Sequence, residues 1–334
     1  MRAPVAALVP WAFLALCVSL AGCALTVTGV EGEREVALPP PPRCAAGAFQ
    51  LTRREAEVLF IVDRSGSMST DIATNATGFT SRWEALYSAL SATLPRYDQS
   101  LTLGLFLFPS ATDSCGVRSD GDVDVPPARS SAPRVFHELR RFGPSGRTPT
   151  GTAVLYGARY LLRRAAADVS RTIVLATDGA PTCSVGGGDE VSDAVAAIAM
   201  ARAQGVSTHV IGISAPGETE LVQALDRMAI AGGHPRAGAV RHYAIHDPAA
   251  LERAFTDIPR SITECTWHAP VGAPVEGVVT LRASELTIPR DTTRREGWDW
   301  TDPTRGEVTL YGSACARFMG QTRALDAAVS CAQP

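Results

Sequence analysis

The middle of the chain alternates between two patterns of hydrophobic residues. Five short segments rich in apolar residues predict buried strands, at residues 58–62, 101–108, 172–176, 206–213 and 240–245. Apolar residues elsewhere recur every three or four positions, and this spacing predicts helices near residues 83–94, 133–141, 154–165, 191–198, 221–228 and 248–258. Strands that alternate with helices predict an α/β fold, a doubly wound and mostly parallel sheet with helices on both faces. Such sheets bind ligands at the carboxyl ends of their strands.

The pattern changes after residue 263. Short strand-like runs, separated by turn residues, lie at residues 278–281, 286–288 and 308–311. Trp298 and Trp300 lie between two of these runs. We therefore predict a small β-rich appendage over residues 264–334, with one short helix after Cys315.

The first residues resemble an export signal. Arg2 precedes an apolar run over residues 4–20, and the tetrapeptide Leu-Ala-Gly-Cys that ends at Cys23 resembles the bacterial lipobox. This resemblance implies a signal peptide over residues 1–22 and a lipid on the Cys23 sulfur, which would hold the protein on a membrane without a spanning helix. An uncleaved membrane anchor is the alternative, and Pro10 together with the short apolar run argues against it.

Residues 23–56 are predicted to form a spacer. They lack apolar periodicity up to residue 43 and contain four consecutive prolines at residues 39–42, which favour a stiff, extended chain. We therefore expect a globular domain over residues 57–263, held away from the membrane surface.

Composition narrows the classes of function. Hydrophobic residues make up 46% of the 334-residue chain, enough for a large core, and the formal net charge is −3. A nearly neutral chain lacks the basic surface on which nucleic-acid binding depends, so nucleic acid is not an expected partner. The sequence lacks the motifs of serine hydrolases, zinc proteases and P-loop NTPases, and its six histidines are scattered, so we do not expect an enzyme.

Carboxyl and hydroxyl side chains follow the first predicted strand. Residues 63–68 read Asp-Arg-Ser-Gly-Ser-Met, a D-x-S-x-S pattern directly after the apolar run. Two further segments follow in order, Gly-Arg-Thr-Pro-Thr-Gly at residues 146–151 and Thr-Asp-Gly at residues 177–179. Together the three segments resemble the metal-ion-dependent adhesion site of the von Willebrand factor A domain family, and the resemblance covers residues 57–263.

The resemblance implies five metal-coordinating positions, at Asp63, Ser65, Ser67, Thr148 and Asp178. Carboxylate and hydroxyl oxygens are hard ligands suited to Mg²⁺, with Ca²⁺ or Mn²⁺ as alternatives. Because the segments lie at the carboxyl ends of strands, we expect them to converge on one edge of the sheet. Thr150 is an alternative to Thr148, although we expect it to cap the following helix.

The expected function follows from the small number of charged ligands. With only two carboxylates, the ion would keep a coordination position that can exchange its ligand. In the family that this sequence resembles, that position captures an Asp or Glu of a protein ligand, so we expect a protein partner that offers a carboxylate. The expected protein is a lipoprotein of the bacterial cell envelope, facing the periplasm or the cell surface. Two alternatives stay open: a structural lipoprotein with a stabilising cation, and a targeting module for a catalytic partner.

The cysteine content fits an exported protein. Of eight cysteines, Cys17 lies in the predicted signal and Cys23 is the predicted lipid acceptor. An even number remains, which suggests disulfides among Cys44, Cys115, Cys183, Cys265, Cys315 and Cys331. We expect Cys115 to pair with Cys183, because both should lie in loops on the ion-binding face. Cys44 and Cys265 flank the domain and are expected to pair, as are Cys315 and Cys331 in the appendage.

Overall fold

The computed structural model describes residues 46–331 except for short internal stretches, at residues 74–77, 111–114, 119–120, 165–168, 185–186, 214–217, 271–272, 274–276 and 319–323. The predicted signal peptide, the lipid acceptor Cys23 and Cys44 lie outside the described residues. Residues 42–334 form one compact unit. Within the part that is described, every helix is too short or too polar to pass through a lipid bilayer.

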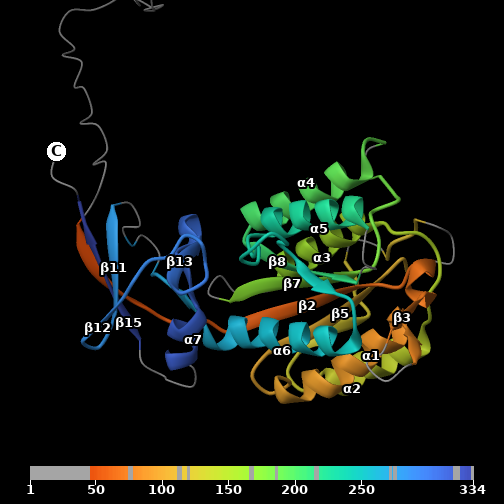
Figure 1. Ribbon diagram of the computed structural model, residues 1–334, viewed down its shortest axis with the longest axis horizontal. Helices are drawn as coiled ribbons and strands as arrows, with labels where there is room; N and C mark the ends of the chain where they lie inside the picture. Colours follow the sequence, from red (N-terminus) through yellow and green to blue (C-terminus); the bar gives the residue numbers. More distant parts are fainter. Residues whose placement is uncertain are drawn as a thin grey trace, which may run out of the picture. The chain divides into compact units, whose positions relative to one another are not determined.

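A six-stranded sheet forms the centre of this unit, in the order β6-β5-β2-β7-β8-β9 (Figure 1). Its strands are β2 (Ala56–Asp63), β5 (Thr102–Phe108), β6 (Val125–Ala128), β7 (Ser170–Thr177), β8 (Val206–Ile213) and β9 (Tyr243–Ile245). Five strands run parallel, and β6 alone is antiparallel, at the edge beside β5. The predicted α/β fold with a mostly parallel sheet is therefore confirmed.

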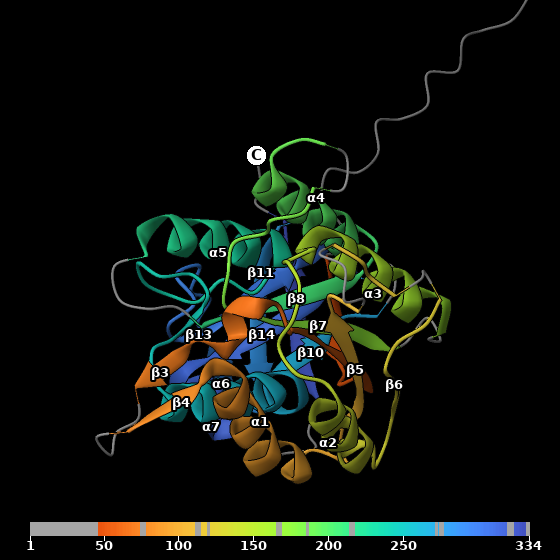
Figure 2. The same cartoon turned by 90° about the vertical axis from the view of Figure 1, so that its right-hand side faces the viewer.

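Helices cover both faces of the sheet (Figure 2). One face carries α1 (Arg82–Thr93), α2 (Ala132–Arg141) and α6 (Pro248–Glu264), and the other carries α3 (Thr150–Arg164), α4 (Glu190–Ala203) and α5 (Thr219–Gly232). A hydrophobic core lies on each face of the sheet. The apolar run of β2 contributes to both cores, because successive side chains of a strand point to opposite faces. Phe60 packs on the α1 side and Leu59 and Ile61 on the α3 side, and all three are fully buried.

Two edge strands differ from the sequence prediction. β6 was not predicted, because its residues Pro126 and Pro127 lack the N–H groups that a central strand needs, and an edge strand tolerates this. β9 begins at Tyr243 rather than at residue 240. The backbone N–H groups just before it, at residues 241 and 242, donate to the Asp226 carboxylate on α5 instead of to a strand.

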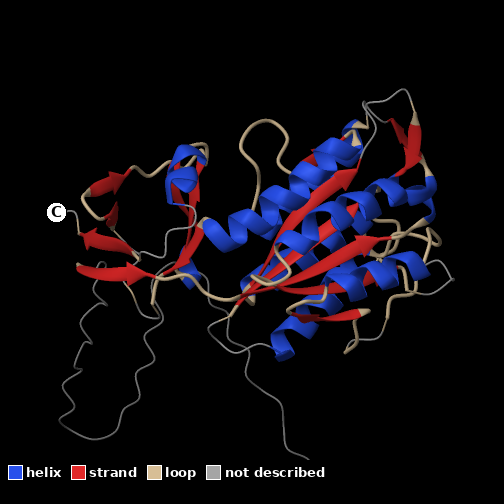
Figure 3. Ribbon diagram, turned by 90° about the horizontal axis from the view of Figure 1, so that it is seen from below, coloured by secondary structure: helices blue, strands red, loops and turns tan. Residues whose placement is uncertain are grey.

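A third hydrophobic core lies in a module of two antiparallel sheets (Figure 3). One sheet has the order β1-β15-β11-β12 and the other β10-β14-β13. The elements are β1 (Gly47–Leu51), β10 (Thr266–His268), β11 (Val278–Ala283), β12 (Leu286–Ile288), β13 (Gly297–Asp302), β14 (Glu307–Tyr311), α7 (Gly312–Phe318) and β15 (Leu325–Ser330). We call this set the β module. The predicted β-rich character of the C-terminal region is confirmed.

The β module includes a strand that precedes the large domain in the sequence. β1 pairs with β15, residue 47 opposite residue 329, so the prediction that residues 23–56 are all spacer is wrong at its C-terminal end. The strand was missed because its partner lies far away in sequence, and only pairing makes so short a segment regular. Trp298 and Trp300 were placed between strands, but both lie in β13 and are buried.

Candidate metal site

The first loop of the candidate site begins where β2 ends. Asp63 is the last residue of β2, and a short 3-10 helix, η1 (Gly66–Ser69), follows. The Ser65 backbone N–H donates to Asp63 Oδ1 at 2.7 Å, which turns the chain back over the end of the strand. The Ser65 and Ser67 hydroxyl oxygens then lie 3.0 Å apart.

The loop between α2 and α3 is fastened to this first loop by backbone hydrogen bonds. The Ser145 N–H donates to the Arg64 carbonyl at 2.6 Å, and the Gly66 N–H donates to the Gly146 carbonyl at 3.0 Å. These two bonds fix the approach of Thr148, which follows two residues later and is buried.

The loop after β7 completes the arrangement. Ser67 Oγ donates to Asp178 Oδ1 at 2.8 Å. Thr148 is tied to the same loop, because its N–H donates to Thr182 Oγ1 at 2.9 Å and the Thr182 N–H donates back to its carbonyl at 3.1 Å. A Cβ added to Gly179 would lie 3.9 Å from both Ser67 Oγ and Thr148 Oγ1. The hydroxyls of two loops therefore lie around Gly179 next to the Asp178 carboxylate.

All five residues singled out in the sequence thus lie at the carboxyl edge of the sheet. They come from the ends of β2 and β7 and from the start of α3, and only Ser67 among them is exposed. The predicted convergence of the three loops agrees with the positions of these side chains.

Two further residues contact the carboxylates and were not predicted. Thr177 Oγ1 donates to Asp63 Oδ2 at 2.6 Å, and Arg82 Nη1 lies 2.8 Å from Asp178 Oδ2. Thr177 could have been found, because it belongs to the Thr-Asp-Gly segment. Arg82 carries no sequence signal, because it opens a helix that follows the exposed hairpin of β3 (Asp71–Ala73) and β4 (Phe79–Ser81).

The pKa values of both aspartates of the site are raised. Burial, followed by the neighbouring Asp178 charge, raises the pKa of Asp63 to about 7, against the opposing effect of the bonds from Thr177 and Ser65. Burial also raises the pKa of Asp178, against the opposing effect of its bonds from Arg82 and Ser67. Two carboxylates held close together in a poorly solvated place favour the arrival of a cation.

Thr150 does not perform the capping role that we predicted. It is the first residue of α3 and fully buried, but its Oγ1 has no hydrogen-bond partner among the described residues. The loop bonds of Thr148, rather than a Thr150 cap, therefore fix how the chain enters this helix.

The donor set fits a hard divalent cation. It consists of carboxylate and hydroxyl oxygens without sulfur or imidazole, the ligands that Mg²⁺, Ca²⁺ and Mn²⁺ accept. Gly179 leaves room among these oxygens, which a side chain would fill. Clusters of three or more His, Cys, Asp or Glu side chains that could hold a metal are absent from the described residues, so a zinc-type centre has no support there.

One predicted disulfide closes the rim of this edge. Cys115 and Cys183 are bonded, with an S–S distance of 2.00 Å and a Cα–Cα distance of 5.9 Å, which confirms this pairing. Cys183 lies in the loop that follows Asp178, and it is buried. The bond therefore ties the loop after β5 to the loop that contributes Asp178.

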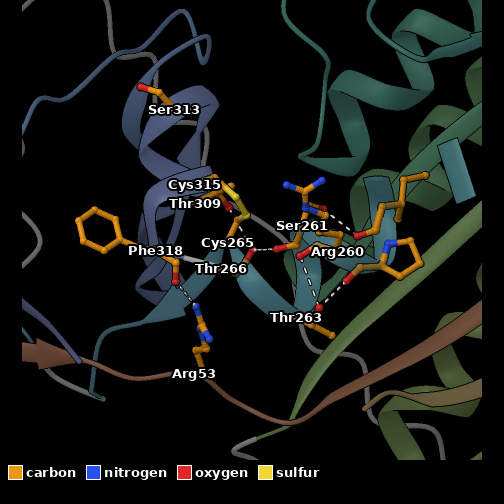
Figure 4. Close-up of a disulfide and its surroundings, with 12 residues drawn as sticks. Arg53, Arg260, Ser261, Thr263, Cys265, Thr266, Thr309, Ser313, Cys315 and Phe318 are labelled. Atoms are coloured by element: carbon orange, nitrogen blue, oxygen red, sulfur yellow. Dashed lines mark hydrogen bonds between the residues drawn. A yellow bond between two sulfur atoms is a disulfide. The ribbon is translucent and has the colours of Figure 1, made fainter. Parts of the chain in front are cut away.

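The other two predicted pairings are wrong. Cys265 is bonded to Cys315 (Figure 4) and not to Cys44, so Cys315 cannot pair with Cys331. The reason is topological, because β10 follows α6 at once and lies beside β14, where the Leu310 N–H donates to the Cys265 carbonyl. α7 begins two residues after Leu310 and brings Cys315 to the end of α6. Cys331 is also disulfide-bonded.

The family of the chain follows from its sequence and this geometry. Residues 57–256 match the family model of the von Willebrand factor type A domain, and the match covers more than half of the chain. The protein therefore belongs to the von Willebrand factor type A domain family. No curated protein sequence matches the chain significantly.

Several solved structures are similar to this chain. The pilus adhesin SpaC from Lactobacillus rhamnosus GG is 16% identical, with a TM-score of 0.50, over 84% of this chain and 40% of its own. The vWF domain of the type V pili tip protein Mfa5 from Porphyromonas gingivalis is 12% identical, with a TM-score of 0.45, over 63% and 96%. The manganese-loaded TRAP protein from Plasmodium vivax is 18% identical, with a TM-score of 0.40, over 64% and 78%. This chain thus spans less than half the length of SpaC, and the similarity concerns the fold.

Proposed function

We propose that the protein binds a divalent cation, Mg²⁺ in the first place, and captures a carboxylate of a protein partner through it. The residues that would hold the ion are Asp63, Ser65, Ser67, Thr148 and Asp178. The observation that carries this proposal is the convergence of hydroxyls and two buried carboxylates around Gly179, at the edge where sheets of this class bind ligands. The bound ion would supply a Lewis-acidic point of attachment.

The charges of the site favour a carboxylate as the partner group. Asp63 and Asp178, when ionised, contribute two negative charges, and Arg82 contributes one positive charge. A divalent ion would leave the site with one net positive charge in surroundings that are poorly solvated. A partner carboxylate would neutralise that charge, whereas a basic side chain would be repelled.

The protein residues would orient the oxygens before any partner arrives. The bonds from Ser65 N–H and Thr177 Oγ1 hold both oxygens of Asp63, and Arg82 holds one oxygen of Asp178. Both carboxylates are thereby fixed at little further entropy cost when the ion binds. Ser67 is exposed, so a partner can reach this side of the site.

Calorimetry with Mg²⁺ and Mn²⁺ tests the ion site. The wild type should bind one ion, and Asp63→Asn and Asp178→Asn should abolish the binding heat because each removes one of the two charged ligands. Asp71→Asn is a matched control, since this exposed aspartate lies on the neighbouring hairpin. Equal ion affinity in the wild type and in Asp63→Asn would rule out the five-residue assignment.

A pull-down from envelope extract, with and without EDTA, tests the partner. Partners that dissociate in EDTA and fail to bind Asp178→Asn support capture through the ion. Partners that stay bound in EDTA would favour the alternative in which the ion only stabilises a structural protein and the β module makes the contacts. Partners with a linked catalytic activity would favour a targeting module.

We further propose that the mature protein is anchored in the bacterial cell envelope by lipid on Cys23. The support is the lipobox-like tetrapeptide at residues 20–23, after the apolar run of residues 4–20. Cys23→Ser should move the protein from the membrane fraction to the soluble fraction. A variant that stays in the membrane would contradict lipid anchoring.

A further inference from the structure

A cavity of about 480 Å³ lies at the opposite end of α6 from its capped start. It is lined by His209 of β8, by the segment after α5, by the last turns of α6, and by β14 and α7 of the β module. Its lining includes none of the five proposed metal-binding residues. The volume suits a small organic molecule rather than a single ion.

The cavity wall is strongly basic. It carries the guanidinium groups of Arg236, Arg260, Arg294 and Arg295, against the single carboxylate of Asp257. Arg294 already donates hydrogen bonds to Asp299 and to backbone carbonyls, so it acts on the cavity mainly through its positive charge. Arg260 lies in the last turns of α6, and Figure 4 shows it near the disulfide of Cys265. Planar guanidinium groups in such a cluster suit carboxylate and phosphate oxygens.

Two aromatic side chains supply flat surfaces in the same cavity. Tyr243 and Tyr311 both line it, and the guanidinium of Arg236 lies 4.8 Å from the centroid of the Tyr243 ring. Stacking on Tyr243 holds the Arg236 side chain extended beside the cavity, although the residue is exposed. An organic ligand could pack against the tyrosine rings while its charged group faces the arginines.

His209 belongs to the buried part of the cavity lining. Its side chain lines the cavity, the residue is only 4% exposed, and neither ring nitrogen has a hydrogen-bond partner among the described residues. The ring stacks on His234, with centroids 4.0 Å apart and planes inclined by 14°. Burial lowers the pKa of His209 to about 3, so the ring is neutral and has one N–H to donate. Both ring nitrogens are buried away from the cavity space, so His209 shapes the wall, and the arginines supply the groups that contact an anion.

We propose that this cavity is a binding site for a small organic anion whose phosphate or carboxylate group contacts Arg236 and Arg260. The site is separate from the candidate metal site, and its existence does not depend on the function proposed there. The β module closes one side of the cavity with β14 and α7, so binding requires both parts of the compact unit.

Calorimetry on the full chain with pyrophosphate and with citrate tests the proposal. The protein is first stripped of divalent ions, so that chelation cannot produce heat. We expect saturable binding of at least one probe, with pyrophosphate favoured if the natural ligand is a phosphate and citrate favoured if it is a carboxylate. Arg236→Gln should weaken this binding about tenfold, the usual scale for one charge-assisted contact.

Arg260→Gln provides the second variant. Glutamine keeps a polar side chain but removes the guanidinium charge, and it should also weaken binding about tenfold. Arg253→Gln, on the exposed side of α6 and outside the cavity, should bind like the wild type. An unchanged melting temperature and circular dichroism spectrum would show that each variant is folded. If Arg260→Gln fails to fold, Arg236→Gln decides. Absence of binding by both probes, or wild-type affinity in Arg236→Gln, would overturn the proposal.

Discussion

Among the described residues, Arg82 is the one cationic side chain that contacts a carboxylate of the candidate metal site. Its side chain is 9% exposed, and that of its partner Asp178 is fully buried. Removing one member of a buried ion pair leaves the other charge without compensation, which costs far more than the pair contributes. Because Asp63 lies nearby, the loss of Arg82 would leave two repelling carboxylates and no positive charge.

We therefore predict that Arg82→Met lowers the free energy of unfolding by about 3 kcal/mol in EDTA. Saturating Mg²⁺ should restore much more stability to this variant than to the wild type, because the ion replaces the missing positive charge. Urea denaturation in EDTA and in Mg²⁺ measures both effects, with the exposed Arg134→Met as control. A loss of the same size in both buffers would mean that Arg82 acts only through packing.

Protonation of Asp63 should compete with the ion. Burial and the Asp178 charge raise its pKa to about 7 in the folded, ion-free protein, compared with about 3.9 in an unfolded chain. The folded state therefore holds an extra proton between these values, and the stability of the ion-free protein falls as pH rises through this window. Below about pH 7, a cation can therefore bind only if Asp63 releases this proton.

We accordingly predict that Mg²⁺ affinity falls about tenfold for each pH unit below about 7 and levels off above it. Calorimetry at several pH values, in buffers of different ionisation enthalpy, would detect both the trend and the released proton. A dissociation constant that does not change between about pH 5.5 and 7 would show that Asp63 is ionised before the ion arrives.

At the scale of elements, the packing of α3 on β2 sets the distance between two loops of the site. Gly157 makes this close approach, because a Cβ there would lie 2.6 Å from Ile61 Cδ1 and 3.1 Å from Leu59 Cδ2. A side chain at this position would push α3 away from the sheet. Thr148 lies two residues before the start of α3 and would move with it.

Gly157→Ala should destabilise the protein by about 1–3 kcal/mol, although alanine is the better helix former, because the added methyl overpacks the core. The same variant should weaken Mg²⁺ binding. Gly143→Ala is the matched control, since nothing lies within 4 Å of its added Cβ. Denaturant titration of both variants measures the difference between their free energies of unfolding. A Gly157→Ala variant as stable as Gly143→Ala would refute the close-packing argument.

At the scale of the whole molecule, the large domain is inserted into the β module. β1 precedes the domain and the remaining strands follow it, so the two share chain connections on both sides. The Cys265–Cys315 bond joins the last turn of α6 to α7, across 50 residues of sequence. It restricts the unfolded chain of the β module more than that of the sheet domain.

Replacing both residues, Cys265→Ser with Cys315→Ser, should lower the stability of the β module by about 4 kcal/mol. Calorimetric melting should then show an early transition assigned to the module, while Mg²⁺ affinity stays at the wild-type value. The double variant Cys115→Ser with Cys183→Ser should show the opposite pattern, with weaker ion binding. A single unchanged transition in the first variant would contradict this division of roles.

Local patterns in the sequence determined the sheet domain. Apolar runs such as residues 58–62 need burial on both faces, and their alternation with helical spacing specifies a parallel sheet whatever the rest of the chain does. The loops with Asp63 and Asp178 were placed at one edge for the same reason, since carboxyl ends of parallel strands lie together. The Cys115–Cys183 bond followed from that placement.

Tertiary structure alone decided the features whose partners lie far apart in sequence. β1 becomes a strand only by pairing with β15, Cys265 finds Cys315 only because β10 pairs with β14, and Arg82 reaches Asp178 across the end of the sheet. The basic cavity beside His209 is assembled from five separate regions of the chain, at residues 209, 234–243, 257–265, 294–295 and 309–316. A contact between distant segments leaves no periodicity in either one, because it depends on how the elements pack rather than on the propensity of each segment.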